Sequence, residues 1–222
     1  MENTIYRHEL DIRVSHGSAL VEPAGTDWRA ELPVLTGKRV VLRELRKSDA
    51  PALHRMVITD EVARFISAPP TSVEGFEQFI SWAHRQRTAG AAAVFAVTLH
   101  GFDTAIGLFQ VRQMDPGFES ADWGFAISSA FWGTGVFKEA ADLMLQFAFE
   151  TLGIHRLEAR ACVNSGRGNG ALIKMGAVQE GVLRKSFLRD GQYHDQFLYT
   201  ILAEDWRVSR RSARFVHSVQ IH

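Results

Sequence analysis

A short apolar strand that runs through a glycine-containing turn into an amphipathic helix is the feature that most constrains this chain. We expect the strand at 120–128 and the helix at 136–151, with Gly133 and Gly135 in the turn between them. Such a turn leaves backbone N–H groups free at the N-terminus of the helix, where the helix dipole adds partial positive charge. The segment therefore predicts a cradle for a phosphate group.

Apolar periodicity and turn residues place the other elements on both sides of this unit. Before it we expect a strand at 39–45, a helix beginning near Ser48, a helix at 72–87, and strands at 93–99 and 105–114. After it we expect strands at 155–163, 178–188 and 193–202, a short helix at 170–175, and a hairpin turn at Asp190–Gly191. The three strands before the central helix predict an antiparallel meander. The strand–helix–strand order of 120–163 predicts a parallel pair joined by a right-handed crossover, with a cleft where the pair diverges.

Composition limits the class of protein. The 222 residues have a formal net charge of zero, so no strong field favours nucleic acid or an acidic membrane. No apolar run approaches the roughly 20 residues of a membrane helix, and the first residues do not form a secretory signal. The single cysteine, Cys162, fits a reducing compartment and a buried small side chain. Nine histidines show no metal-ligand spacing. We therefore expect a cytoplasmic protein without a metal.

Four segments carry a resemblance to a known family. They are Leu35–Arg43, Trp132–Ala140, the stretch from Asn164 to Arg184, and the stretch from Asp190 to Ile201. In this order and spacing they resemble the GNAT N-acetyltransferases, and within them the RimJ/RimL branch. The resemblance implies a mixed α/β fold with a mostly antiparallel sheet, a splayed parallel strand pair and flanking helices. It covers about 35–206, which leaves an N-terminal arm at 1–34, with a short strand near 12–14, and a basic C-terminal tail at 207–222.

The resemblance implies acetyl-coenzyme A as cosubstrate. Its pyrophosphate would lie on the backbone amides of 133–138, with Lys138 as a charge partner. Its pantetheine arm would pair with the backbone of the preceding strand, and two asparagines would assist. The residues expected to bind it are Phe125, Ala126, Ile127, Gly133, Thr134, Gly135, Val136, Phe137, Lys138, Asn164 and Asn169.

Three positions depart from the family pattern. Trp132 stands where the family often has Arg or Gln, and Phe137 where it often has Gly or Ala. Arg167 stands at the family's Ser position, and we interpret 165–170 as a turn that is one residue longer than usual. Bulky side chains are compatible with a loop that binds phosphate through its backbone, whereas any catalytic role of the family's Ser is put in doubt by Arg167.

Transfer of an acetyl group to an amine requires a base for the ammonium, a donor for the thioester oxygen and an acid for the thiolate. We assign Asp122 as the base, with Glu44, Glu119 and Glu180 as alternatives. Tyr193 is the candidate acid, and a backbone amide near Ala126 is the candidate oxyanion donor. Because no Ser or Cys nucleophile is evident, we expect direct transfer in a ternary complex.

The acceptor is a primary amine, either a peptide N-terminus or a small molecule, and the sequence does not choose between them. Two other hypotheses stay open. One is a catalytically silent acyl-coenzyme A-binding module with Arg167 in place of the Ser. The other is a protein-interaction factor that uses the basic tail. We expect a monomer or a homodimer, since the edge strand at 192–202 can pair with a second copy or be capped.

Overall fold

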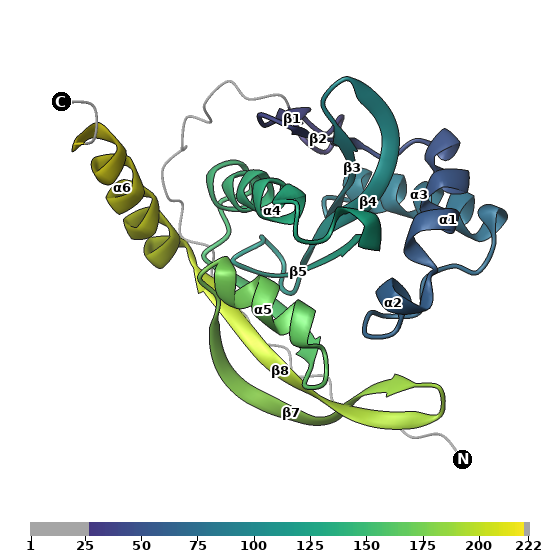
Figure 1. Cartoon of the computed structure of the whole chain (residues 1–222). Coiled ribbons are helices and arrows are strands. Elements are labelled where there is room, and N and C mark those ends of the chain that lie inside the picture. Colours follow the sequence, from purple (N-terminus) through teal and green to yellow (C-terminus); the bar gives the residue numbers. More distant parts are fainter. Residues whose placement is uncertain (1–26, 220–222) are drawn as a thin grey trace, which may run out of the picture.

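The computed structural model describes residues 27–219 and shows one mixed sheet with helices on both faces (Figure 1). The described strands are β1 Leu35–Thr36, β2 Val40–Glu44, β3 Ala92–Leu99, β4 Phe102–Gln113, β5 Ser120–Ile127, β6 Arg156–Cys162, β7 Val178–Arg189 and β8 Gln192–Leu202. The helices are α1 Ala50–Val57, α2 Asp60–Ala63, α3 Val73–Thr88, α4 Val136–Gln146, α5 Gly166–Lys174 and α6 Ala203–Val219. A π-helical turn at Phe147–Thr151 extends α4. The expected element order is confirmed, except that the sequence did not predict β1, α2, α6 or two single 3-10 turns at Lys47–Asp49 and Ser129–Phe131.

The strand order is β1-β2-β3-β4-β5-β6-β8-β7, and every neighbouring pair is antiparallel except β5 and β6. The expected meander and the expected parallel pair are therefore both present. Parallel pairing joins only Ser120 to Arg156, Ala121 to Leu157 and Asp122 to Glu158. Beyond these three positions, β5 and β6 do not pair with each other, so the two strands separate toward their C-terminal ends.

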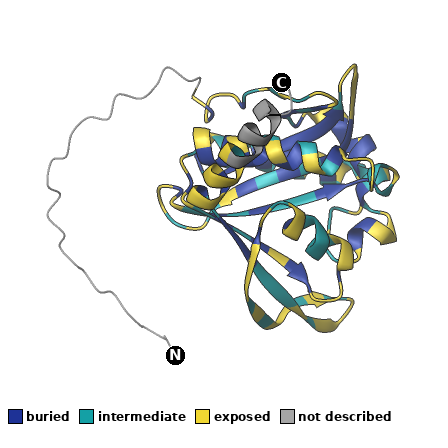
Figure 2. Ribbon diagram, turned by 60° about the vertical axis from the view of Figure 1, so that its left-hand side comes forward, coloured by how far each residue is buried: buried dark blue, intermediate teal, exposed yellow. Residues whose placement is uncertain are grey.

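Two apolar clusters hold the helices to opposite faces of the sheet. On one face, α4 buries side chains such as Met144 against Phe95 and Phe109. On the other face, α1 and α3 bury Leu53 and Ile80 around Ala96 and Ala126. Phe79 and Trp82 stack on one another at the margin of this second cluster, so they serve as packing residues. Figure 2 shows the buried residues concentrated in the central strands, with β7 and the hairpin end of β8 much more exposed.

The helix boundaries follow from their caps. The α3 helix begins after Ser72, whose hydroxyl accepts from the Gly75 amide. The α5 helix begins at Gly166, so our expectation of a turn over 165–170 and a helix only from 170 was wrong. The hydroxyl of Ser165 accepts from the Gly168 amide, and Asn169 donates to the Cys162 and Val163 carbonyls at the end of β6. These contacts offset the low helix propensity of the glycines.

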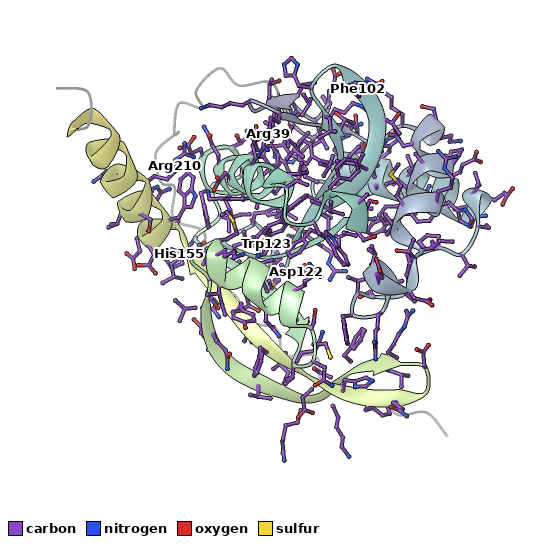
Figure 3. The ribbon with its side chains drawn as sticks, in the orientation of Figure 1. Arg39, Phe102, Asp122, Trp123, His155 and Arg210 are labelled. Carbon is purple, nitrogen blue, oxygen red and sulfur yellow. The ribbon has the colours of Figure 1, made fainter. Side chains whose placement is uncertain are left out.

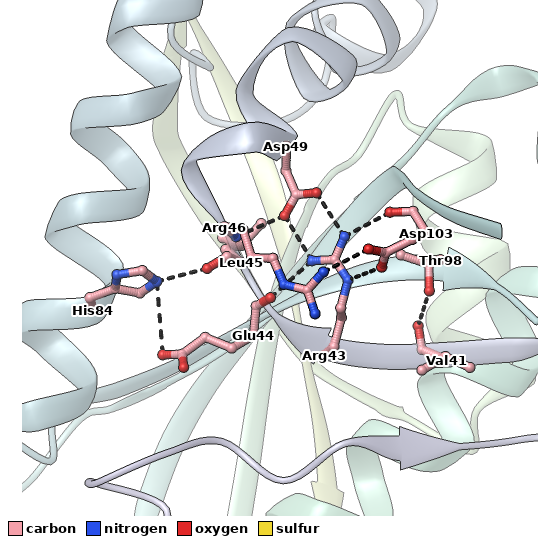
Figure 4. Close-up of polar contacts among 9 residues, drawn as sticks. All are labelled: Val41, Arg43, Glu44, Leu45, Arg46, Asp49, His84, Thr98 and Asp103. Atoms are coloured by element: carbon pink, nitrogen blue, oxygen red, sulfur yellow. Dashed lines mark hydrogen bonds and ion pairs between the residues drawn. The ribbon is translucent and has the colours of Figure 1, made fainter.

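A buried ion-pair cluster fixes the far edge of the sheet (Figure 4). The guanidinium of Arg43, on β2, donates to both carboxylate oxygens of Asp49 at 2.7 and 2.8 Å and to Asp103 at 2.6 Å. Asp103 also accepts from Arg46. The hydrogen bond from Arg43 is the main cause that lowers the pKa of Asp103. Open hollows beside this cluster are lined in part by Arg43, Asp49 and Asp103, which already pair with one another, and β3 and β4 lie between the hollows and β5.

The ends of the chain differ from the expected division. Trp28 and Leu32, within the expected arm, are buried in the main core, and the predicted strand near 12–14 lies outside the described residues. Residues 207–219 of the expected tail belong to α6, which starts at Ala203, buries Trp206 against Phe149 and then projects from the body (Figure 1). Within residues 27–219, no helix has the length and apolarity needed to cross a bilayer.

Candidate active site

The candidate site, which we call the cleft, is the region where β5 and β6 cease to pair with each other, beside the N-terminus of α4. In Figure 3, Asp122 and Trp123 mark this point on β5, and Arg39 lies close to α4. Two features lie together here. One is the edge of β5 that no longer pairs with β6, and the other is the N-terminus of α4, which follows β5 in the chain after a short loop.

The register of β4 and β5 decides which backbone groups of β5 face the cleft. The Ser128 amide donates to the Ile106 carbonyl, and the Met114 amide donates to the Ser120 carbonyl. Hydrogen-bonded positions alternate along an antiparallel pair, so Ala126 also directs its N–H and C=O groups to β4. The backbone groups of Phe125 and Ile127 point the other way, into the cleft. Of the three residues expected to pair with a pantetheine arm, Phe125 and Ile127 therefore have the required orientation, and Ala126 is committed to Leu108.

The N-terminus of α4 has free backbone donors. Gly135 is the N-cap residue, with a φ of 87°, and no side chain caps the helix. Among the described residues, the amides of Gly133, Thr134, Gly135, Phe137 and Lys138 donate to no protein acceptor. The Val136 amide has only a long contact, 3.4 Å, to the Thr134 hydroxyl. By contrast, serine hydroxyls cap α3 and α5. The uncapped donors and the helix dipole together suit an anion.

Phe137 is accommodated by the core. Its ring lies 4.6 Å from that of Phe125 and 5.9 Å from that of Phe109, measured between centroids. The side chain therefore points toward the sheet, and its backbone amide stays at the helix N-terminus. This position explains how a bulky residue replaces the family's Gly or Ala without filling the phosphate cradle.

Arg39, which the sequence did not indicate as a site residue, lies against the loop at 133–135. Its guanidinium donates to the Thr134 carbonyl at 2.9 Å and to Glu139 at 3.2 Å. It packs so closely on Gly135 that an added Cβ would lie 2.7 Å from Nη2. Burial raises the pKa of Glu139, but hydrogen bonds from the Arg39 amide and side chain outweigh it and lower the pKa overall. Lys138, the expected charge partner, pairs instead with Asp142 one turn along α4.

Asp122 lies at the last paired position of β5, where the cleft begins. Both of its carboxylate oxygens accept hydrogen bonds from Arg112 on β4, at 3.0 and 2.9 Å. The hydrogen bond to Asp122 raises the pKa of the Arg112 guanidinium, so this arginine remains charged. Glu158 of β6 stands directly beside Asp122 in the parallel register and is held by Arg156 at 2.9 Å. The vertex of the cleft thus carries two arginine-paired carboxylates.

Tyr193 lies apart from Asp122. The last β6 residue that pairs with β8 is Cys162, opposite Gln196, so the hairpin of β7 and β8 extends past the end of β6. Tyr193 is three residues farther out, about 10 Å along the strand, and its side chain is 63% exposed. Strand alternation places it on the sheet face of Phe197 and Tyr199, opposite to that of Asp122.

The two asparagines differ in their surroundings. Asn169 donates to two carbonyls at the end of β6, and its Oδ1 atom is buried without a hydrogen-bond partner. This unpaired buried oxygen could accept a hydrogen bond from an amide N–H group of a bound pantetheine arm. The side chain of Asn164 is exposed and forms no hydrogen bond within the described part of the chain. Among the described side chains, the His, Cys, Asp and Glu residues do not gather into a metal-binding group.

Comparison with known proteins agrees with this geometry. The family model of the acetyltransferase (GNAT) domain matches residues 39–177, more than half of the chain. The chain belongs to the GNAT acetyltransferase family. The match begins at Arg39 and ends just after α5, so it contains the loop, the splayed strands and both helices of the site.

Relatives and structural neighbours include members of the RimJ/RimL-like group. The chain is 27% identical to an uncharacterized N-acetyltransferase, YoaA, of Bacillus subtilis, over 77% of this chain and 97% of that protein. It is 28% identical to the [ribosomal protein uS5]-alanine N-acetyltransferase of Escherichia coli, over 42% of this chain and 48% of the relative. Its fold matches that of Mycobacterium smegmatis RimJ in complex with CoA-disulfide, with a TM-score of 0.69 and 23% identity, over 75% and 83% of the two chains.

Proposed function

We propose that this protein is an acetyl-coenzyme A-dependent N-acetyltransferase. The observation that carries the proposal is the cleft-facing edge of β5, at Phe125 and at the Ile127 amide, which leads directly to the uncapped N-terminus of α4. The Ile127 carbonyl on this edge accepts from Trp132. An extended amide-bearing arm fits the first feature and a pyrophosphate fits the second. The bound coenzyme A thioester would supply the acetyl group.

The residues of the chain would then orient the reactants. The amides of 133–138 and the Arg39 guanidinium would hold the phosphates, and the backbone of Phe125 and Ile127 would align the arm. One of these two amides, and not that of Ala126, would polarise the thioester oxygen, because both face the cleft. Asp122 lies at the vertex of the cleft, where it would accept the proton of the acceptor ammonium or hold a water that does so. Arg112 would keep the carboxylate in place.

The acceptor in this proposal is a primary amine, at a peptide N-terminus or on a small molecule. The similarity to the uS5-alanine N-acetyltransferase of Escherichia coli supports the peptide class. A screen of peptides and amines, read by thiol release from acetyl-coenzyme A and by product mass, tests the activity. We expect one class of acceptor to gain 42 Da per turnover, the mass of an acetyl group replacing a proton. Labelling of the enzyme itself as a required intermediate would contradict direct transfer.

A pair of variants tests the role of Asp122. Asp122→Asn is expected to lower kcat about 100-fold while the Kd for acetyl-coenzyme A stays the same, because the backbone cradle is untouched. Glu119→Gln changes the other carboxylate near the start of β5 and should leave both values unchanged. Loss of activity in Glu119→Gln alone would assign the base to Glu119.

The silent binding module is the second candidate, and two observations favour it. By the resemblance, Arg167 stands at the family's Ser position, and Tyr193 is exposed beyond the end of β6. Coenzyme A binding without turnover over a broad acceptor panel would support this candidate over the enzyme. The tail-based interaction factor has less support, because Arg210 stacks on Trp206 and hydrogen-bonds to Gln146.

A further inference from the structure

Two of the three departures from the family pattern touch each other. Arg167, from the first turn of α5, places its guanidinium carbon 4.4 Å from the ring centroid of Trp132. Trp132 immediately precedes the loop at the N-terminus of α4, so the contact joins the segment after β5 to the segment after β6. A guanidinium at this distance over an indole is a cation–π pair.

The indole of Trp132 is itself held in place. Its Nε1 atom donates to the Ile127 carbonyl at 2.9 Å, and this carbonyl belongs to the cleft-facing edge of β5. The ring also packs against the apolar cluster under α1 and α3. Trp132 is therefore a fixed platform at the outer end of the cleft, and Arg167 lies on its face.

Stacking leaves the hydrogen-bonding edge of the guanidinium free, because the N–H groups lie in its plane. Within residues 27–219, Arg167 forms no hydrogen bond and no ion pair. Its neighbour in the stack is adjacent in sequence to the loop whose amides also lack acceptors. A charged donor set thus lies against the residue that immediately precedes a set of uncapped amides.

We propose that Arg167 binds a phosphate of coenzyme A and that Trp132 is a positioning residue that holds its guanidinium at the mouth of the cleft. The inference rests on the proposed function. Planar guanidinium groups bind phosphate oxygens in pairs, and a side chain already fixed by stacking loses less entropy on binding. In this account the tryptophan and the arginine depart from the family pattern as a matched pair.

Isothermal titration with coenzyme A tests both roles. Arg167→Met keeps the length of the side chain but removes the charge, and it should raise Kd about tenfold or more. Arg167→Lys should recover part of the loss. Trp132→Leu should raise Kd about two- to fivefold, and Trp132→Phe, which keeps a ring in the same packing, should lie between. Arg210→Met is the matched control. It removes the cation–π contact in α6, where the guanidinium carbon of Arg210 lies 4.8 Å from the ring centroid of Trp206, and it should leave Kd unchanged.

A double-mutant cycle separates positioning from general damage to the loop. If Trp132 acts through Arg167, Trp132→Leu has no further effect in the Arg167→Met background. Titration with dephospho-coenzyme A identifies the phosphate. A loss with both ligands supports contact with the pyrophosphate, and a loss with coenzyme A alone supports contact with the 3′-phosphate.

Two results overturn the inference and are distinguishable from each other. If wild type binds coenzyme A and the variants of Arg167 bind it equally well, Arg167 is not a phosphate ligand. If the effects of Trp132→Leu and Arg167→Met simply add, Trp132 does not position Arg167. Failure of wild type to bind coenzyme A would instead refute the proposed function, and the inference with it.

Discussion

Replacing Gly135 with alanine is a direct test of the loop that precedes α4. Gly135 has a φ of 87°, and Gly133 has a φ of 75°. Left-handed backbone costs a residue with a Cβ about 1–2 kcal/mol. At Gly133 this strain is the whole cost, because no atom lies within 4 Å of an added Cβ. At Gly135 the added Cβ also displaces Arg39. Disruption of the half-exposed ion pair between Arg39 and Glu139 adds at most about 1 kcal/mol to the cost.

We therefore expect Gly133→Ala to lose about 1–2 kcal/mol of unfolding free energy and Gly135→Ala about 1–3 kcal/mol. Urea denaturation measures both, with an unchanged m-value as the check that only stability has moved. Both variants should also bind coenzyme A more weakly at a temperature where they remain folded, because the strained residues carry the free amides.

Gly166→Ala is the matched control. Gly166 is the first residue of α5, its φ is not positive, and an added Cβ meets nothing within 4 Å. Alanine there should be neutral or stabilising by up to about 1 kcal/mol. If Gly135→Ala behaves like Gly166→Ala in both stability and ligand binding, the loop does not depend on its left-handed glycines and the reasoning is refuted.

Two further predictions concern stability. Asp49→Asn should lower the free energy of unfolding, measured by urea denaturation, by about 3 kcal/mol. This is near the lower end for breaking a buried ion pair, because Asp103 still pairs with the buried Arg43. A loss no greater than that caused by Asp103→Asn would contradict this prediction. The lowered pKa of Glu139 predicts stability that is present above the ordinary value of 4.5 and is lost as the pH falls through the lower folded-state pKa. The stability of wild type should therefore fall more steeply below pH 5 than that of Glu139→Gln, and parallel profiles would show that Glu139 contributes nothing.

The sequence predicted most of the fold because its signals were local. Apolar periodicity located α4, turn residues separated β3, β4 and β5, and Asp190–Gly191 fixed the closing hairpin. The start of α5 was missed, because three glycines outweighed a serine cap in the local pattern. The anchoring of that helix by Asn169 depends on β6 carbonyls, which only the folded chain brings within reach.

For the candidate site, the sequence allowed a prediction of the backbone arrangement but not of the side-chain contacts. The loop and the cleft follow from the order of elements, whereas the side-chain partners come from distant segments. Arg39 and Glu139 are 100 positions apart, and nothing in either segment indicates the other. The pairing of Asp122 with Arg112 needed the β4–β5 register, and the contact of Trp132 with Arg167 needed the separation of β5 and β6.

The central claim is that the splayed strands and the N-terminus of α4 form one binding site for coenzyme A. A coenzyme A titration of ¹⁵N-labelled protein, followed through backbone amide shifts, tests it most directly. We predict saturable shifts at 133–138 and at Phe125 and Ile127, with Ala126 less affected because its amide donates to β4. Absence of saturable shifts, or shifts confined to the Arg43 cluster on the far edge of the sheet, would contradict the claim.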